Sequence, residues 1–410
     1  MRKTALIIVT LDTKAEEALF IKGMLESRGL AVLIMDGGSL GHPPAVADIS
    51  RTEVAARAGW DLTELLATLD KGRIIASMTE GLTAWARTLY EAGRIHGVLA
   101  LGGGQGTAMG AAAMQVLPLG FPKVMVTTLA AGNLRPFLET KDIAVFPSVA
   151  DMLGMNHILT LTLGNAANAL AAMVLQQSAG CGRARRTLGA TAFGTTTSGL
   201  MKLRELLRGP ELEMVFFHAN GTGGAALESL AENGLFDLIL AWTTHEVVDL
   251  VAGGIFAARP SYLDLLAQRE VSCLVSTGAI DYVCMGPAVE LDSDWRNRNI
   301  IVHNRNITLV RARPLEMVRA AGFLADKLNR ARGPVKVMIP LEGFCEPNAR
   351  GKQFYEPETD RQFTLALKAA LRTDIEVIEL PCHINDDSFI ERAAREIKTL
   401  LPGSGPGKTA

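Results

Sequence analysis

A strand pattern followed by a tight turn and a helix pattern recurs along this chain, and this alternation limits the possible folds more than any other feature. In the first half, strands are expected up to Leu11 and over 31–35, 96–101, 123–128 and 143–146. In the second half, they are expected near 188–193, 213–218, 238–242, 272–276 and 335–339. Repeated strand–helix–strand units place strands parallel in a sheet that helices cover on both faces. The sequence therefore predicts an α/β fold with mostly parallel sheets.

The length and one change of composition divide the chain into two parts. At 410 residues, the chain is longer than one hydrophobic core normally supports. Around residues 176–187 the alternation gives way to serine, alanine, glycine and arginine. We therefore expect an N-terminal α/β domain over 1–180, a C-terminal α/β domain over 187–402 and a disordered tail over 403–410.

The helix boundaries follow from glycine positions and capping residues. Helices are predicted over about 14–28 and 107–116, and over 61–95 with breaks near Gly72 and Gly81. Thr359 and Ser388 are the expected N-caps of two late helices, because apolar residues recur after each at helical spacing.

Charge, cysteine spacing and hydropathy argue against several classes of protein. The 41 basic and 43 acidic residues give a net charge of −2, so no nucleic-acid partner is expected. The five cysteines are scattered without a CxxC pair, which indicates neither a zinc site nor a disulfide framework, and no metal ligands are predicted. No signal-peptide pattern is present, and the apolar stretch 158–178 carries threonines and asparagines, which favour a buried helix over a membrane span. We expect a cytoplasmic protein without a membrane partner.

The most distinctive turn is GGGQGT at 102–107, directly after one strand and directly before a helix. Gly102, Gly103, Gly104 and Gly106 let the backbone approach a ligand, and Gln105 lies between them. A helix N-terminus presents unpaired N–H groups to an anion, and Thr107 could cap that helix or donate to a phosphate. The turn is neither a Walker A loop nor a GxGxxG fingerprint in its usual position. The alternative is a purely structural turn, but its place between strand and helix favours phosphate binding.

A second candidate turn, Thr10 to Lys14, ends the first strand. Asp12 could hold magnesium or a ribose hydroxyl, Thr13 could cap a helix and Lys14 could neutralise a phosphate. The alternative is an ordinary N-cap. Three residues that follow neighbouring strands complete the predicted ligand-binding edge: Asp36, Thr127 and Thr128.

The second half carries another glycine turn, HANGTGG at 218–224. Asn220, Gly221, Thr222, Gly223 and Gly224 could form a second anion site. His218 could carry a proton there, although a lone histidine at a strand end is more often structural.

Other polar residues follow strands in this half. They are the hydroxyl-rich turn 194–199, residues 243–246 (TTHE), Asp281 and Glu342. Asp281 or Glu342 could act as a general base, and either could equally be a helix cap or an ion-pair partner.

Read in order, these segments resemble the ATP-binding domain family named after the N-terminal domain of the tomato mosaic virus resistance protein, which has many bacterial members of unknown function. The segments that carry the resemblance are LDTKAEE (11–17), GGGQGT (102–107), HANGTGG (218–224), STGAID (276–281), HN (303–304), FYEPE (354–358) and HIND (383–386). The resemblance implies two Rossmann-like lobes with a cleft between them, self-association as a homodimer or higher homo-oligomer, and ATP bound by the first lobe. Ala15, Gly104 and Asn220 depart from the residues usual in the family, but they leave the backbone turns intact.

Three functional hypotheses follow. The first is an ATP-binding enzyme, with magnesium, that acts on a small anionic metabolite at the cleft between the lobes. The second is a nucleotide-binding regulatory or scaffold protein without turnover. The third is a nucleotide-independent lyase or acyl hydrolase that uses the second lobe alone.

Overall fold

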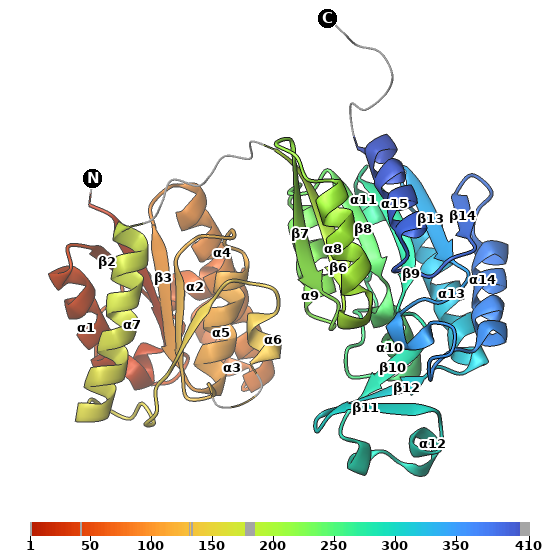
Figure 1. Ribbon diagram of the computed structural model, residues 1–410. Helices are drawn as coiled ribbons and strands as arrows, with labels where there is room; N and C mark the ends of the chain where they lie inside the picture. The colour runs from red at the N-terminus through yellow and green to blue at the C-terminus, as the bar shows by residue number, and fades with distance from the viewer. Residues whose placement is uncertain (1, 42, 131, 133, 177–184, 402–410) are drawn as a thin grey trace, which may run out of the picture. The chain divides into compact units, whose positions relative to one another are not determined.

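Two separate parallel sheets organise the chain, one in each of two units, Met1–Cys181 and Gly182–Ala410. The computed structural model describes residues 2–41, 43–130, 132, 134–176 and 185–401 (Figure 1). Most of the predicted linker and the predicted tail at 403–410 lie outside the described residues.

The N-terminal unit contains a sheet with strand order β2-β1-β3-β4-β5, and all its neighbouring strands pair in parallel. Its strands are β1 (Thr4–Val9), β2 (Ala31–Asp36), β3 (Gly97–Gly102), β4 (Lys123–Thr127) and β5 (Ala144–Pro147). Its helices are α1 (Leu11–Ser27), α2 (Arg51–Arg57), α3 (Leu62–Ala67), α4 (Lys71–Glu91), α5 (Gly104–Gln115), α6 (Arg135–Leu138) and α7 (His157–Leu175).

Alternating strand residues serve two separate cores on the two faces of this sheet. Ile7 and Leu99 pack with α1 and α7, whereas Leu6 and Val98 pack with α2, α4 and α5. Because both faces are covered, the strands are buried on both sides and consist almost entirely of apolar residues. Figure 1 shows α7 lying along one face of this sheet.

The C-terminal unit contains a six-stranded parallel sheet with strand order β14-β13-β9-β8-β6-β7. Its strands are β6 (Arg186–Ala192), β7 (Leu212–His218), β8 (Leu238–Thr243), β9 (Ser272–Gly278), β13 (Val335–Pro340) and β14 (Glu376–Leu380). Its helices are η1 (Gly194–Thr196), α8 (Thr197–Leu206), α9 (Gly223–Glu232), α10 (His245–Ala252), α11 (Leu265–Gln268), η2 (Ala288–Glu290), α12 (Ser293–Arg296), α13 (Pro314–Asn329), η3 (Glu346–Asn348), α14 (Pro357–Ala370) and α15 (Asp387–Leu400).

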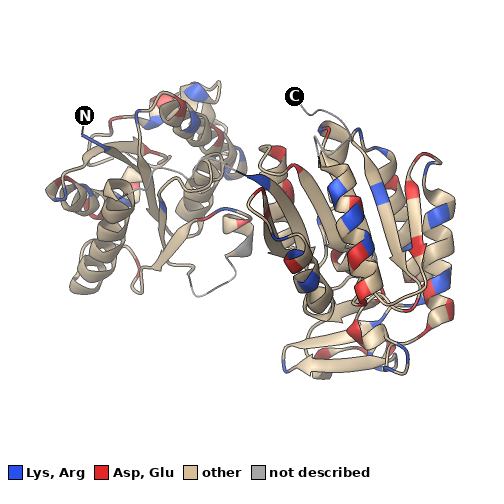
Figure 2. Cartoon of the chain, turned by 45° about the horizontal axis from the view of Figure 1, so that its top comes forward, with Lys and Arg blue, Asp and Glu red and all other residues tan. Residues whose placement is uncertain are grey.

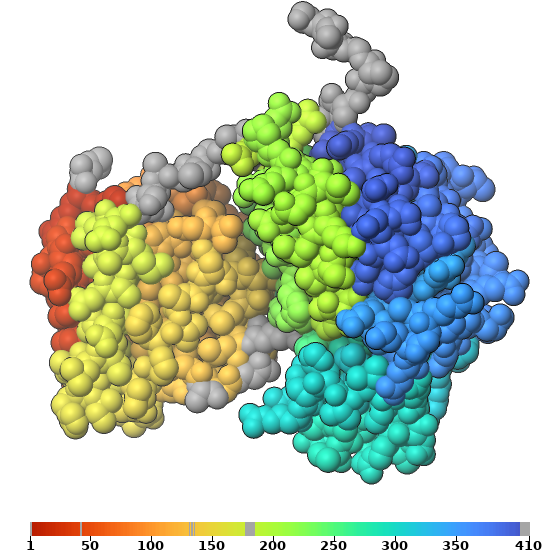
Figure 3. Space-filling view, in the orientation of Figure 1, coloured from red at the N-terminus to blue at the C-terminus, as the bar shows by residue number. Residues whose placement is uncertain are grey.

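Helices also cover both faces of this second sheet. One core joins the sheet to α8 and α15, and the other joins it to α9, α10, α11, α13 and α14. Figure 3 shows α8 and α15 side by side on one face of the unit. Lysine and arginine alternate with acidic residues along the helices of this unit (Figure 2), so the charges do not gather by sign there.

A small antiparallel sheet extends the C-terminal unit. It has the order β10-β12-β11 and consists of β10 (Tyr282–Met285), β12 (Ile307–Arg311) and β11 (Ile300–Asn304). The predicted alternation of parallel strands does not anticipate this sheet, because its strands are short and lie outside that pattern.

One of the two predicted breaks in the N-terminal helices is confirmed and the other is wrong. α3 ends at Ala67 and α4 begins at Lys71, so the helices break next to Gly72, whereas α4 runs through Gly81 without interruption. Gly81 is needed for packing, because a Cβ there would lie 2.0 Å from the carbonyl oxygen of Val54 in α2. The glycine therefore allows two helices to approach closely inside a continuous helix.

Two predicted N-caps in the C-terminal unit are also wrong. α14 has Glu356 at its N-cap and α15 has Asp386, so Thr359 and Ser388 lie inside the first turns. In both cases the helix begins before the threonine or serine that the apolar spacing favours as its cap.

The apolar segment predicted as a buried helix is α7. This helix is the one in the described chain that is long and apolar enough to cross a membrane by length and composition. Leu159, Leu163, Leu170 and Val174 are buried against the sheet and α1. α7 is thus a covering helix of a globular α/β unit.

Two glycine-to-alanine changes in the N-terminal unit should alter its stability in opposite directions. A Cβ at Gly110 would lie 2.4 Å from that of Ala100, so Gly110→Ala should destabilise the unit by about 1–3 kcal/mol through overpacking. Gly23 lies exposed in α1 with open space around it, so Gly23→Ala should stabilise by up to about 1 kcal/mol. Urea unfolding of the two variants would measure both effects, and a stable Gly110→Ala protein would contradict the packing of α5 on β3.

Candidate functional site

A pocket lies at the carboxyl ends of β1 and β3 in the N-terminal unit. α1 leaves β1 toward one face of the sheet and α5 leaves β3 toward the other. In an open parallel sheet, such a reversal creates a crevice where ligands bind. The pocket has a volume of about 590 Å³. It is lined by Thr10, Asp12, Thr13, Lys14, Ser39, Leu40, Leu66, Leu69, Lys71, Ile74, Ile75, Gly102, Gly103, Gly104, Gln105 and Gly106. The two turns predicted to bind an anion therefore meet in one pocket.

The glycine turn forms one wall through its backbone. A Cβ on Gly102 would lie 2.7 Å from the Cα of Gly106, so this close turn requires glycine. A Cβ on Gly103 would lie 3.7 Å from the Thr128 hydroxyl oxygen, an ordinary contact, and one on Gly104 would have nothing within 4 Å. The N–H groups of Gly104, Gln105 and Gly106 have no acceptor in the described part of the chain. The turn thus offers unpaired donors and the positive end of the α5 dipole to a ligand.

α5 begins three residues earlier than predicted, with Gly103 as its N-cap. Thr107 therefore lies inside the first turn and is not the cap. Its hydroxyl is buried, 2.6 Å from the Thr127 hydroxyl, and it also donates to the Gly102 carbonyl. Thr107 and Thr127 brace the turn from behind and do not line the pocket, and Thr128, which is exposed, does not line it either.

The turn after β1 is irregular in a way that shapes the opposite wall. α1 is kinked at Lys14, whose backbone angles are not helical, so the regular helix starts after it. The Thr10 and Thr13 hydroxyls lie 3.0 Å apart and bond to each other, and the N–H of Lys14 donates to the Thr10 carbonyl. Thr13 therefore bonds within the turn and is not the N-cap, which is Thr10.

The two carboxylates of this edge are engaged by backbone donors. Oδ2 of Asp12 accepts the N–H groups of Ser39 and Leu40 at 2.9 and 2.7 Å. Oδ1 of Asp36 accepts from Leu11 and Gly38, and Asp36 is buried outside the pocket. Burial raises the pKa of Asp36, although these two N–H groups oppose the rise. Both side chains hold loops in place.

Two lysines supply the positive charge of the pocket. Lys14 and Lys71 line it and form no ion pair with any other described residue. The side chains of Leu66, Leu69, Ile74 and Ile75 give the pocket an apolar wall. The pocket therefore combines unpaired N–H donors and two cations with an apolar surface.

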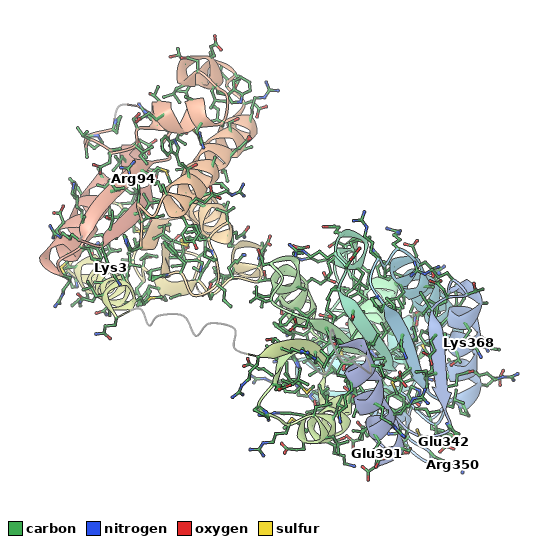
Figure 4. All side chains as sticks on the ribbon, turned by 90° about the horizontal axis from the view of Figure 1, so that it is seen from above. Lys3, Arg94, Glu342, Arg350, Lys368 and Glu391 are labelled. Atoms are coloured by element: carbon green, nitrogen blue, oxygen red, sulfur yellow. The ribbon has the colours of Figure 1, made fainter. Side chains whose placement is uncertain are left out.

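The three predicted catalytic residues of the C-terminal unit are not brought together. His218 ends β7, Asp281 follows β9 and Glu342 follows β13, and two strands separate β7 from β9. Neighbouring strands lie about 4.8 Å apart, so the ends of β7 and β9 are roughly 14 Å apart. Glu342 is exposed at the periphery of this unit (Figure 4).

Each of these residues has a different environment. His218 is exposed and stacks on Phe193, with ring centroids 5.2 Å apart. Asp281 is buried 3.4 Å from the Arg311 guanidinium and accepts the Cys345 thiol at 3.3 Å. Its Oδ1 atom has no hydrogen-bond partner among the described residues. Arg311 also pairs with the buried Asp360, so Asp281 belongs to an internal ion-pair network.

The chain's own Glu246 fills the predicted second anion site. Its carboxylate accepts the N–H groups of Gly221 and Gly224, and a Cβ on Gly224 would lie 2.1 Å from Oε2. Asn220 Oδ1 accepts from Thr222 and Gly223, which closes the turn on itself. The donors predicted to hold an external anion are therefore used by an internal one.

Glu246 belongs to a buried acidic group that sequence reasoning did not assign to a site. Burial raises the pKa of Glu246 to about 7, and the N–H groups of Gly221 and Gly224 oppose the rise. Burial also raises the pKa of Glu228 to about 7, with Glu246 adding to the effect, although Glu228 accepts the N–H of Leu263. The sequence feature that could have pointed to this acidic group is the run TTHE (243–246), which spans the end of the apolar strand β8 and the start of α10.

Replacing Glu228 with glutamine should remove a pH-dependent loss of stability. The folded-state pKa of about 7 lies above the usual 4.5, so the unfolded chain releases this proton first as pH rises. The contribution of Glu228 to the free energy of unfolding is therefore most favourable below pH 4.5, falls between pH 4.5 and 7 and stays lowered above pH 7. The free energy of unfolding of Glu228→Gln, measured relative to the wild type, should therefore be on the order of 3 kcal/mol higher at pH 8 than at pH 4.5. Urea unfolding at the two pH values measures this gain, with the exposed Glu270→Gln as the matched control.

Comparison with known proteins identifies the family. Models of the N-terminal and C-terminal domains of the uncharacterised protein family UPF0261 match residues 3–179 and 185–401. A UPF0261 protein of Clostridium tetani is 35% identical over 98% of this chain and 100% of its own length. The ToMV resistance protein Tm-1(GCR237) of Solanum lycopersicum is 34% identical over 82% of this chain and 45% of its own length.

A solved UDP-GlcNAc 2-epimerase from Methanocaldococcus jannaschii covers 98% of this chain and 93% of its own, with 11% identity and a TM-score of 0.22. At this TM-score the likeness supports no inference about function. The two family models together span nearly all of the sequence. The chain therefore belongs to the UPF0261 family, to which the tomato Tm-1 protein is also related in sequence.

Proposed function

We propose that the N-terminal unit binds ATP in the pocket between the ends of β1 and β3. The observation that carries this proposal is the meeting of three unpaired N–H groups with Lys14 and Lys71 in one pocket of about 590 Å³. Unpaired N–H groups at a helix N-terminus and lysine ammonium groups together match the oxygens of a polyphosphate. The resemblance to the Tm-1 ATP-binding domains, which rests on GGGQGT and LDTKAEE, names the same two turns.

The apolar wall supports a nucleotide over a free phosphate. Leu66, Leu69, Ile74 and Ile75 come from α3, α4 and the link between them, whereas the donors come from α5 and the turn after β1. A ligand that fills the pocket therefore has a charged part and an apolar part, as a nucleoside triphosphate does.

The residues of the pocket fit a magnesium ion that binds together with the phosphates of ATP. Asp12 is the one carboxylate among the described lining residues, and its Oδ2 atom already accepts two N–H groups. Mg²⁺ is usually held by one or two carboxylates together with substrate phosphates and water. Most of its ligands here would come from ATP and water.

The small number of acidic residues in the pocket lining favours a second candidate function, a nucleotide-binding regulatory or scaffold role. Apart from Asp12, no acidic residue or histidine is among the described residues that line the pocket, so it offers no general base for attack on a phosphate. The alternative, an enzyme that acts on a small anionic metabolite, has less support, because Glu246 occupies the turn predicted to hold that anion. Self-association and a cytoplasmic location stay predictions.

Magnesium–ATP should stabilise the wild-type protein, and removal of either pocket lysine should reduce that effect. Saturation at a hundred times Kd adds about 2.7 kcal/mol, which thermal melting detects as a shift of several degrees. Loss of one hydrogen bond to a charged group costs about 1.5–3 kcal/mol, so Lys14→Met and Lys71→Met should each weaken Kd by roughly 10- to 100-fold. Lys22→Met, on the same helix as Lys14 but outside the pocket, is the matched control.

A change at Gly104 separates ligand binding from folding. An aspartate at this first helical position suits the α5 dipole and its Cβ would meet no atom within 4 Å, so Gly104→Asp should fold normally. Its carboxylate would repel the phosphates and abolish the shift caused by ATP. ATP that binds Gly104→Asp as tightly as the wild type would rule out this turn as the phosphate site, and analysis of the recovered nucleotide would show whether ATP is hydrolysed.

A further inference from the structure

Three side chains of different chemistry converge inside the C-terminal unit, apart from the nucleotide pocket. His245 and Asp249 are one helical turn apart on α10, and Cys284 comes from β10. One ligand atom from each, a ring nitrogen, a carboxylate oxygen and the sulfur, lies within 4.8 Å of the other two. All three residues are fully buried. None of them has a role in the proposed nucleotide site.

The imidazole of His245 is oriented as a metal ligand would be. Its Nδ1 lies 3.3 Å from the Ala279 carbonyl oxygen, to which it can donate a proton. Nε2 has no hydrogen-bond partner among the described residues and lies 3.5 Å from Oδ1 of Asp249. Metal-bound histidines nearly always donate their other N–H to a carbonyl or carboxylate, which leaves the second nitrogen for the metal.

The carboxylate of Asp249 is held in place by the backbone. Oδ1 accepts the N–H of Cys284 and Oδ2 accepts that of Phe256, both at 2.9 Å. A Cβ on Gly254 would lie 2.3 Å from the carboxylate carbon, so only glycine fits beside it. Each oxygen accepts one of these bonds and keeps a lone pair, so the carboxylate is fixed while still able to bind an ion.

Neither a catalytic triad nor a simple ion pair accounts for the whole geometry of these three side chains. A nucleophilic Cys–His–Asp arrangement needs a thiol that a substrate can reach, and Cys284 is completely buried. A His245–Asp249 ion pair with the cysteine sulfur beside it leaves Nε2 without an aligned hydrogen bond. A metal ion uses the nitrogen, the oxygen and the sulfur together.

We propose that the C-terminal unit binds one divalent transition-metal ion, with zinc as the best match, through His245 Nε2, Asp249 Oδ1 and Cys284 Sγ. Nitrogen, oxygen and thiolate sulfur are the ligands that zinc takes in proteins. Three protein ligands leave a fourth position of a tetrahedral ion for water. The ion ties α10 to β10 and so fixes the small antiparallel sheet against the parallel one.

Metal analysis of protein purified without a histidine tag tests the proposal. After removal of metal with a chelator, the wild-type chain should take up one Zn²⁺ per chain. Cys284→Ser should bind Zn²⁺ more than about 100-fold more weakly, because even residues that only support a ligand change affinity by 10- to 100-fold. Cys273→Ser, which alters another buried thiol, and His218→Gln, which alters an exposed histidine, should bind as the wild type does.

A cobalt spectrum of the wild type keeps the test decisive even where a variant fails to fold. Cobalt bound to Cys284 should show thiolate-to-metal charge-transfer absorption in the near ultraviolet. Wild-type protein that takes up no zinc, or cobalt-loaded protein without this absorption, would overturn the proposal. Equal loss of zinc in Cys273→Ser and Cys284→Ser would also overturn it. None of these outcomes depends on whether the N-terminal unit binds ATP.

Discussion

Buried or partly buried carboxylates that accept backbone N–H groups hold the loops at the carboxyl ends of the strands, and the shape of both units depends on them. Asp12 and Asp36 do this in the N-terminal unit and Glu246 does it in the C-terminal unit, where Glu228 and Asp249 also accept the N–H groups of Leu263, Phe256 and Cys284. An unpaired N–H group buried away from water costs free energy, and so does a buried charge without partners. Each carboxylate supplies an acceptor for buried N–H groups, and these N–H groups in turn stabilise its charge, which explains how these acidic side chains can lie inside the protein.

The turn at 102–106 differs from these loops, and the difference is what makes it a ligand site. Its first helical N–H groups have no internal carboxylate, whereas those of the turn at 220–224 bond to Glu246. The two turns have similar compositions, and the first lines a pocket in which Lys14 and Lys71 form no ion pair with another described residue. Glycine content therefore indicates that backbone can approach an anion closely, and it does not indicate whether the anion is a ligand or a side chain of the same chain.

Contacts between residues far apart in the sequence, such as that between Glu246 and the turn at 220–224, limit what the sequence predicts. The parallel α/β class and the meeting of Lys14 with the glycine turn follow from strand-end positions, because all parallel strands end at one edge. The true start of α5 at Gly104 does not follow from the sequence, because glycine has a low helix propensity and the run of glycines therefore favours a turn as far as Gly106. Glu246 accepts hydrogen bonds from Gly221 and Gly224, which lie 25 and 22 positions earlier, and the local sequence does not predict such a contact. The approach of Cys284 to α10 depends on a small antiparallel sheet that the alternation does not predict.

The two sheets share a strand order but use it differently. Counted within each unit, the N-terminal order is 2-1-3-4-5 and the C-terminal order is 2-1-3-4-5-6, so both have a point between their first and third strands where the helices diverge. In the C-terminal unit, the side-chain hydroxyls of Thr191 and Thr196 connect the end of β6 and the turn after it to the end of β8 at this point. Thr191 bonds to both the N–H and the carbonyl of Thr243, and Thr196 bonds to the hydroxyl of Thr243 at 2.8 Å. Asn385 also holds the loop after β6, through the carbonyl of Thr195. Side-chain hydrogen bonds thus bridge this point in the second unit, whereas the same point in the first unit faces a pocket with unpaired N–H groups, which is why we propose the nucleotide site in the first unit.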